Sequence, residues 1–69
     1  MKTYRIYIKP YDPRASVVIS SVTNRESTGK DTGDGGIMTC ICEEVQLYKV
    51  VQALETSDIL SLEKVVVLP

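Results

Sequence analysis

The chain has 69 residues and a formal net charge of −1, from eight lysines and arginines and nine aspartates and glutamates. This length supports one domain with a single small core, which we place at residues 1–69. The balanced charge argues against nucleic-acid binding by bulk electrostatics, and the absence of histidine removes the usual general base of enzymes.

A strand is expected at the start of the chain, because residues 2–9 alternate between two kinds of side chain. One face of this strand holds Tyr4, Ile6 and Ile8. The other face holds Arg5, Tyr7 and Lys9. Two prolines interrupt the pattern in residues 10–14, which also contain Tyr11, so the chain is expected to turn there.

The segment 15–23 is rich in β-branched residues, and this composition favours a second strand that returns antiparallel to the first. A helix is the alternative. Asp12 followed by Pro13 is a helix-start pattern, and Val18 and Val22 share one helical face.

Residues 24–36 contain no apolar side chain and hold all four glycines of the chain, which predicts a flexible loop exposed to solvent. The loop lacks the spacing of a phosphate-binding loop and the final glutamate of a calcium loop, so no metal site is expected. A weaker hypothesis is an anion site made from backbone amides and two cations. Its residues are Arg25, Lys30, Gly33, Gly35 and Gly36.

Residues 37–42 are interpreted as a third strand, although they also fit a backward extension of the helix that follows. Cys40 and Cys42 would lie on one face of that strand. We interpret them as small apolar core residues, because half of a zinc site would need a second copy of the chain to complete it.

The segment 43–56 predicts an amphipathic helix, with Leu47, Val50 and Leu54 on one face. Polar residues at 56–58 are expected to end it. A last strand is expected at 62–68, and its apolar end, 65–68, predicts burial on both faces or at the centre of a sheet.

These elements predict an α+β domain in which a mainly antiparallel sheet of three or four strands is covered on one face by one helix. The expected order is β-β-β-α-β, with β-β-α-β as the alternative. No apolar segment has the ~20 residues of a membrane span, and none has the form of a secretory leader, so a cytoplasmic protein is expected.

The expected function is that of a non-enzymatic protein-interaction module without a cofactor. Because the core is small, a partner is expected: either a larger protein that the chain regulates or inhibits, or a second copy bound through the sheet. The proposed contact residues are Arg5, Tyr7, Lys9 and Tyr11. The alternatives are binding of a small anion or nucleotide by the loop at 24–36, and binding of single-stranded nucleic acid by Arg5, Tyr7 and Lys9.

Overall fold

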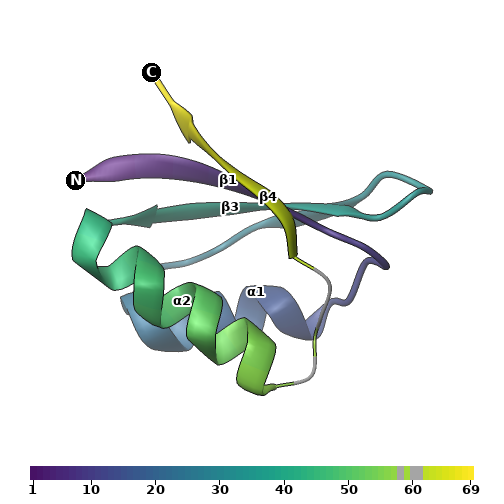
Figure 1. Cartoon of the computed structure of the whole chain (residues 1–69), viewed down its shortest axis with the longest axis horizontal. Coiled ribbons are helices and arrows are strands. Elements are labelled where there is room, and N and C mark those ends of the chain that lie inside the picture. The colour runs from purple at the N-terminus through teal and green to yellow at the C-terminus, as the bar shows by residue number, and fades with distance from the viewer. Residues whose placement is uncertain (58, 60–61) are drawn as a thin grey trace.

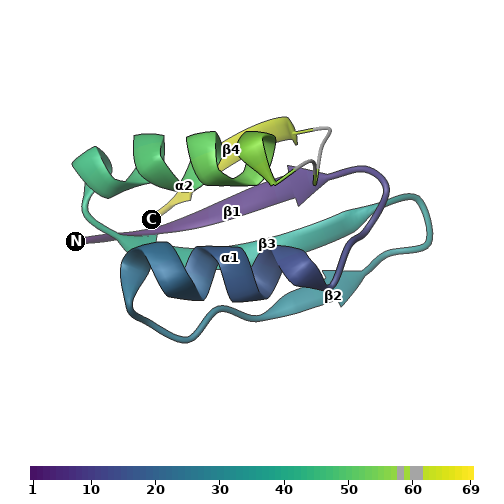
Figure 2. The same cartoon turned by 90° about the horizontal axis from the view of Figure 1, so that it is seen from below.

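The computed structural model describes residues 1–57, 59 and 62–69. Its elements in chain order are β1 (Lys2–Ile8), α1 (Arg14–Thr23), β2 (Gly29–Asp31), β3 (Gly36–Cys42), α2 (Glu44–Thr56) and β4 (Leu62–Leu68). The strands form one antiparallel sheet in the order β2-β3-β1-β4. Both helices cover the same side of this sheet (Figures 1 and 2). The predicted class, an α+β domain built on a mainly antiparallel sheet, is confirmed.

The order of the strands makes β1 and β3 the centre of the sheet. β1 and β2 run parallel with β3 between them, and β3 and β4 run parallel with β1 between them. This is the split β-α-β arrangement, also called ferredoxin-like. Thr3 lies opposite Leu68, so both ends of the chain lie at the same end of the sheet (Figure 1).

The core lies between the sheet and the two helices, and the central strands supply most of it. On β1 the buried side chains are Tyr4, Ile6 and Ile8. On β3 they are Met38, Cys40 and Cys42. These residues alternate with side chains on the opposite face, as period-two strands require. The predicted burial of the even-numbered face of β1 is therefore confirmed.

Tyr4 carries the one buried side-chain oxygen for which the described residues offer no hydrogen-bond partner. Burial raises the pKa of the Tyr4 phenol, and the negative charge of Glu44 raises it further. The phenol therefore stays neutral at physiological pH.

The segment 15–23 is a helix, so the favoured strand assignment was wrong. α1 buries Ala15, Ile19 and Thr23, which recur every fourth residue and so line one helical face. β-branched residues cost a helix only a few tenths of a kcal/mol each relative to the best helix formers. Packing of this face against the sheet and α2 outweighs that preference, and the domain has two helices where one was expected.

The ends of α1 are fixed by short-range hydrogen bonds. The carboxylate of Asp12 accepts a hydrogen bond from the backbone N–H of Arg14 at 2.9 Å, and the Asp12 carbonyl accepts one from Ala15 at 3.0 Å. At the other end, Asn24 adopts a left-handed conformation with φ of 57° and donates to the Ser20 carbonyl. Asparagine tolerates this conformation better than most residues, and so it ends the helix.

The predicted loop at 24–36 contains an edge strand and a tight turn. β2 pairs with β3, where Lys30 lies opposite Ile37 and Asp31 lies opposite Gly36. In the turn between them, the backbone N–H of Thr32 donates to the Gly35 carbonyl at 3.0 Å. All three residues of β2 are exposed, so no apolar alternation marks this strand in the sequence.

The third strand and the amphipathic helix are confirmed as β3 and α2. α2 buries Val50 and Leu54, and it begins with a capping box between Glu43 and Gln46. In this box Glu43 accepts from the backbone of Gln46, and the Gln46 side chain accepts from the Glu43 N–H at 3.1 Å. α2 ends at Thr56, and Asp58, the last residue of the predicted polar end, lies outside the described residues.

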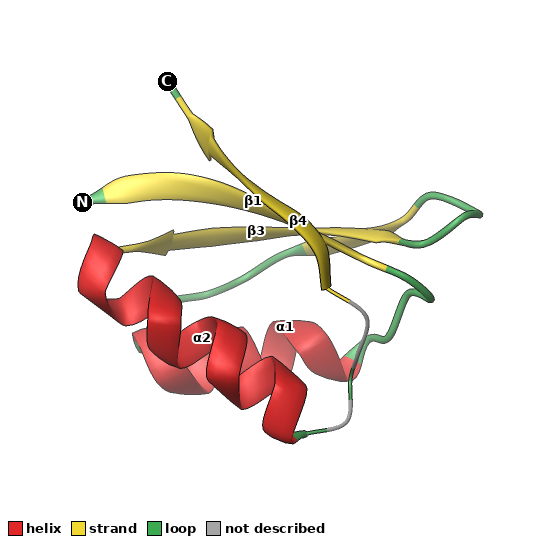
Figure 3. Ribbon diagram, in the orientation of Figure 1, coloured by secondary structure: helices red, strands yellow, loops and turns green. Residues whose placement is uncertain are grey.

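β4 is confirmed as a strand, but its predicted position at the centre of the sheet was wrong. It is an edge strand that pairs only with β1 (Figure 3). Val66 is 37% exposed and Val67 is 52% exposed. The apolar composition of 65–68 therefore exceeds what burial within one chain requires.

We predict that Gly35→Ala destabilises the fold by about 1 to 3 kcal/mol, because the new methyl group would overlap the backbone carbonyl oxygen of Ile8. Gly29→Ala is the matched control. Its methyl group would meet the flexible end of the Met38 side chain, which can move, so a smaller loss of stability is expected. Urea unfolding of both variants measures the difference, and equal losses would contradict the close approach at Gly35.

We also predict that Asp12 makes stability depend on acid pH. The Arg14 side chain donates to the Asp12 carboxylate at 2.6 Å, and this hydrogen bond, with one from the Arg14 backbone, lowers the pKa of Asp12. The ionised group therefore stabilises the fold above its unfolded pKa of ~3.9, and this contribution disappears as the pH falls through the lower folded-state pKa. Urea denaturation at pH 7 and below pH 4 should show that the free energy of unfolding falls less on acidification for Asp12→Asn than for the wild-type chain.

Candidate interaction surface

The face of the sheet away from the helices, which we call the open face, is the main candidate surface. Strand alternation and register assign to it the side chains of Thr3, Arg5, Tyr7, Lys30, Ile37, Thr39, Ile41, Lys64, Val66 and Leu68. Three of these side chains are cationic and none is a carboxylate. Neither helix lies against this face in Figures 1 and 2.

Arg5 and Lys30 line the same depression on the open face, although they are far apart in the sequence. Its volume is about 420 Å³, and its other lining residues are Thr28, Gly29, Ile37 and Thr39. β3 lies between β1 and β2, and Arg5 lies opposite Thr39 whereas Lys30 lies opposite Ile37. The two cationic residues are therefore separated by two strand spacings across the sheet and two residues along it, or roughly 12 Å between their backbones. Two cations beside the hydroxyl groups of two threonines favour a carboxylate or another anion between them.

A second depression, of about 260 Å³, lies at the hairpin end of the same face. It is lined by Tyr7 and Ile37 together with Ile8, Thr32, Asp34, Gly35 and Gly36. Tyr7 pairs in register with both Ile37 and Lys64, and the ammonium group of Lys64 lies 4.7 Å from the centre of the Tyr7 ring. This cation–π contact holds an aromatic ring and a positive charge together beside the first depression.

The remaining apolar side chains make the open face more than a charged patch. Ile41 is 39% exposed and Val66 is 37% exposed, while Tyr7, Ile37 and Leu68 are half-buried. The face thus combines a partly apolar centre with cations, which is the composition of many protein-binding surfaces.

The structure separates the four predicted contact residues. Arg5 and Tyr7 lie on the open face, as their place in the alternation indicated. Lys9 follows the end of β1 and lies beside Gly35, and it lines neither depression described above. Tyr11 packs against the core on the helix side of the sheet, where a methyl group on Gly36 would collide with its ring. Tyr11 is therefore not part of the open face.

The predicted anion site of the glycine-rich segment does not form as a group. Gly35 and Gly36 are buried at the start of β3, and Arg25 lies near the end of α1. The N–H of Gly33 donates to the Asp31 carboxylate at 2.9 Å, so that amide already has an anionic partner. Lys30 points to the open face, and it joins Arg5 there.

Sequence reasoning missed Lys64, Ile37, Thr28 and Thr39 as members of the surface. The alternation of 37–42 indicates that Ile37 and Thr39 share one face of their strand. Only the register with β1 shows that they lie beside Tyr7 and Arg5. Lys64 required the pairing of β4 with β1, and Thr28 required the β2–β3 hairpin.

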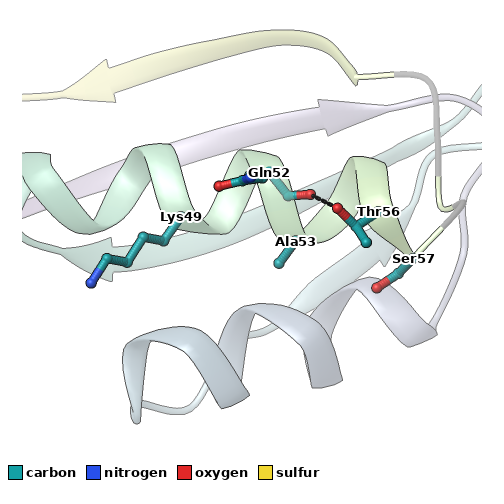
Figure 4. Close-up of a pocket in the computed structure, with 5 residues that line it drawn as sticks. All are labelled: Lys49, Gln52, Ala53, Thr56 and Ser57. Atoms are coloured by element: carbon teal, nitrogen blue, oxygen red, sulfur yellow. Dashed lines mark hydrogen bonds between the residues drawn. The ribbon is translucent and has the colours of Figure 1, made fainter.

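A third hollow lies on the helix layer and has little chemistry to offer. It measures about 330 Å³ and is lined by Lys49, Gln52, Ala53, Thr56 and Ser57 (Figure 4). The Thr56 hydroxyl donates to the Gln52 carbonyl at 2.8 Å, and the Lys49 side chain extends away from the other residues drawn. No group of polar side chains converges there.

Cys40 and Cys42 are buried side by side under the sheet, with their sulfur atoms 3.6 Å apart. Burial, assisted by the contact with Cys42, raises the pKa of Cys40 to about 12. Their predicted role as small apolar core residues is confirmed by this burial. Among the residues that the structure describes, no three histidine, cysteine, aspartate or glutamate side chains are grouped as metal ligands would be.

The described helices, α1 and α2, have ten and thirteen residues, and neither is long and apolar enough to cross a membrane. Comparison with known proteins found no matching family model, no matching curated protein and no matching solved structure. The function therefore has to be inferred from the open face itself.

We predict that neither native thiol reacts with Ellman's reagent at pH 8 within minutes, because Cys40 is protonated and both sulfur atoms are shielded from solvent. Both should react at once in guanidinium chloride. Val17→Cys supplies a positive control, since Val17 is 65% exposed on α1. Rapid modification of the folded wild-type chain would show that the sheet opens readily at β3.

Proposed function

We propose that this chain is a non-enzymatic protein-interaction module that binds an acidic surface or segment of a larger protein through its open face. The observation that carries the proposal is the shared depression of Arg5 and Lys30, which has two cations, two threonines and no carboxylate among its lining residues. A partner carboxylate placed there would form charge-assisted hydrogen bonds with both cations.

The rest of the open face suits a protein partner. Tyr7 is an amphipathic aromatic residue whose ring is held by Lys64, and arginine and tyrosine are enriched among residues that dominate binding energy. Ile37, Ile41 and Val66 provide apolar contact area around them. Binding would hide this area from water while the cations select an acidic partner over a neutral one.

Single-stranded nucleic acid is less well supported as the partner. Such ligands bind by stacking successive bases on aromatic side chains along a cationic groove. The open face offers one aromatic ring, Tyr7, and the neighbouring positions on β3 hold Ile37, Thr39 and Ile41, which cannot stack in this way. The net charge of −1 also gives little general attraction for a polyanion.

A module of this kind would act by occupying a surface of its partner protein. It contains no histidine and both of its thiols are buried, so no Ser–His or Cys–His pair can form in it. Covering an acidic site on another protein is sufficient for a stoichiometric regulator or inhibitor, and this is the role we propose.

The test is affinity capture from a lysate of the source cells by three forms of the chain. Arg5→Glu combined with Lys30→Glu should reduce capture of the specific partner by at least about tenfold, because each lost charge-assisted contact is worth about 1.5 to 3 kcal/mol. Lys49→Glu on α2 is the matched control and should capture as wild type does. Higher salt should weaken the wild-type complex.

Two results would contradict the proposal. Equal capture by the double variant would show that the open face is not the contact surface. Loss of capture after nuclease treatment, together with binding of a fluorescent oligothymidylate, would assign the face to nucleic acid instead.

A further inference from the structure

The outer edge of β4 is the least protected part of the sheet. β4 has seven residues and pairs only with β1, so the hydrogen-bonding groups along its other side have no strand beside them. Val67 lies opposite the buried Tyr4, on the helix side, yet it is 52% exposed. Val66, on the open face, is 37% exposed. An apolar edge strand of this length is a template for pairing with another strand.

The usual protection of a sheet edge is confined to the first part of β4, where the register with β1 shifts between Lys64 and Leu62, and residues 65–68 carry no charged side chain. Lysine on an edge strand normally keeps other strands away. Lys64 is the one charged side chain that the structure describes on β4, and it leans inward, over the ring of Tyr7 on β1. The opposite edge is different, because β2 has only three residues and includes Lys30 and Asp31. The molecule thus has one protected edge and one open edge.

We propose that β4 pairs antiparallel with β4 of a second copy of this chain, which joins two four-stranded sheets into one continuous sheet. This inference does not depend on the proposed binding of an acidic partner. It accounts for the apolar residues 65–68, whose composition is that of a buried strand although β4 lies at an edge.

A second copy fits this edge because the strand is complementary to itself. With a two-fold axis at Val66, that residue faces its own copy, Val65 faces the partner's Val67, and Lys64 faces the partner's Leu68. Like charges do not meet in this register, and the half-exposed valines gain cross-strand partners. The pairing is isologous, so it closes at two copies and uses the longer of the two edge strands that the structure describes in each.

Pairing at β4 would also place two open faces on one side of a single sheet. Each copy would keep its own depression at Arg5 and Lys30, which opens on the face of the sheet and not on the outer edge of β4. Arg5 lies opposite Val66 on the neighbouring strand, and Lys30 lies at the far edge of the sheet, on β2. An acidic partner with two binding segments would then meet two sites at once. The dimer and the open face are therefore compatible.

Light scattering coupled to size exclusion tests the proposal on the unmodified chain. The expected mass is twice the 7.7 kDa of one chain, with dissociation on dilution. Val67→Lys should shift the protein to a monomer, because it places a cation beside the pairing edge of each copy. Val17→Lys is the matched control, since Val17 is an exposed valine of α1, and it should leave the mass unchanged.

A cross-linking variant tests the register independently of stability. Val66→Cys should form a covalent dimer on oxidation with diamide, whereas Val17→Cys should not. A wild-type chain that is monomeric at every concentration would overturn the proposal. The edge of β4 would then be available to a strand of another protein. Equal cross-linking of both cysteine variants would also overturn the proposal. The Arg5→Glu and Lys30→Glu variant should remain dimeric, so failure of one proposal is distinguishable from failure of the other.

Discussion

Burial of one face of β1 beneath both helices is the constraint on which the rest of this structure depends. β1 has strands on both sides, and its side chains alternate between the core and the open face. A shift of one residue would send Ile6 to solvent and Arg5 into the core. The register that protects Tyr4, Ile6 and Ile8 is therefore the same register that presents Arg5 and Tyr7 outside.

The same constraint explains why so short a chain can have both a core and an uncovered face of its sheet. Two helices on one side give a closed layer, and the other side of the sheet remains uncovered (Figure 2). The buried thiols belong to this arrangement, because Cys40 and Cys42 are fully buried members of the core on the helix side of β3. The interior is therefore packed mainly with apolar side chains, and the charged side chains Arg5, Lys30 and Lys64 lie on the open face.

Elements with a strong period were predictable from the sequence. The alternation of 2–9 and the helical spacing of 43–56 gave β1 and α2, because each pattern matches only one geometry. The prediction for 15–23 was wrong because β-branched composition indicates a strand. The helical spacing of Ala15, Ile19 and Thr23 decides the outcome. That spacing stabilises a helix only when α2 and the sheet are present to bury these three side chains. β2 left no apolar pattern because its side chains are all exposed.

The candidate surface was predictable only in part. Arg5 and Tyr7 follow from the local alternation of one strand. The approach of Lys30 to Arg5 depends on the hairpin that lays β2 beside β3, and that pairing is a property of the backbone rather than of side-chain type. The edge position of β4 could not be predicted from the sequence for a related reason. An apolar strand has the same composition whether its own chain or another chain covers it.

The antiparallel pairing of β1 with β4 also determines how the chain could be circularly permuted. Because Thr3 lies opposite Leu68, these two residues are separated by about the spacing of neighbouring strands, and a short linker from one to the other could join the two strands. New ends could be opened at Gly33, where the exposed turn of the β2–β3 hairpin lies at the far end of the sheet (Figure 1). A circular permutant of this kind would keep every strand neighbour while reversing which segments are made first.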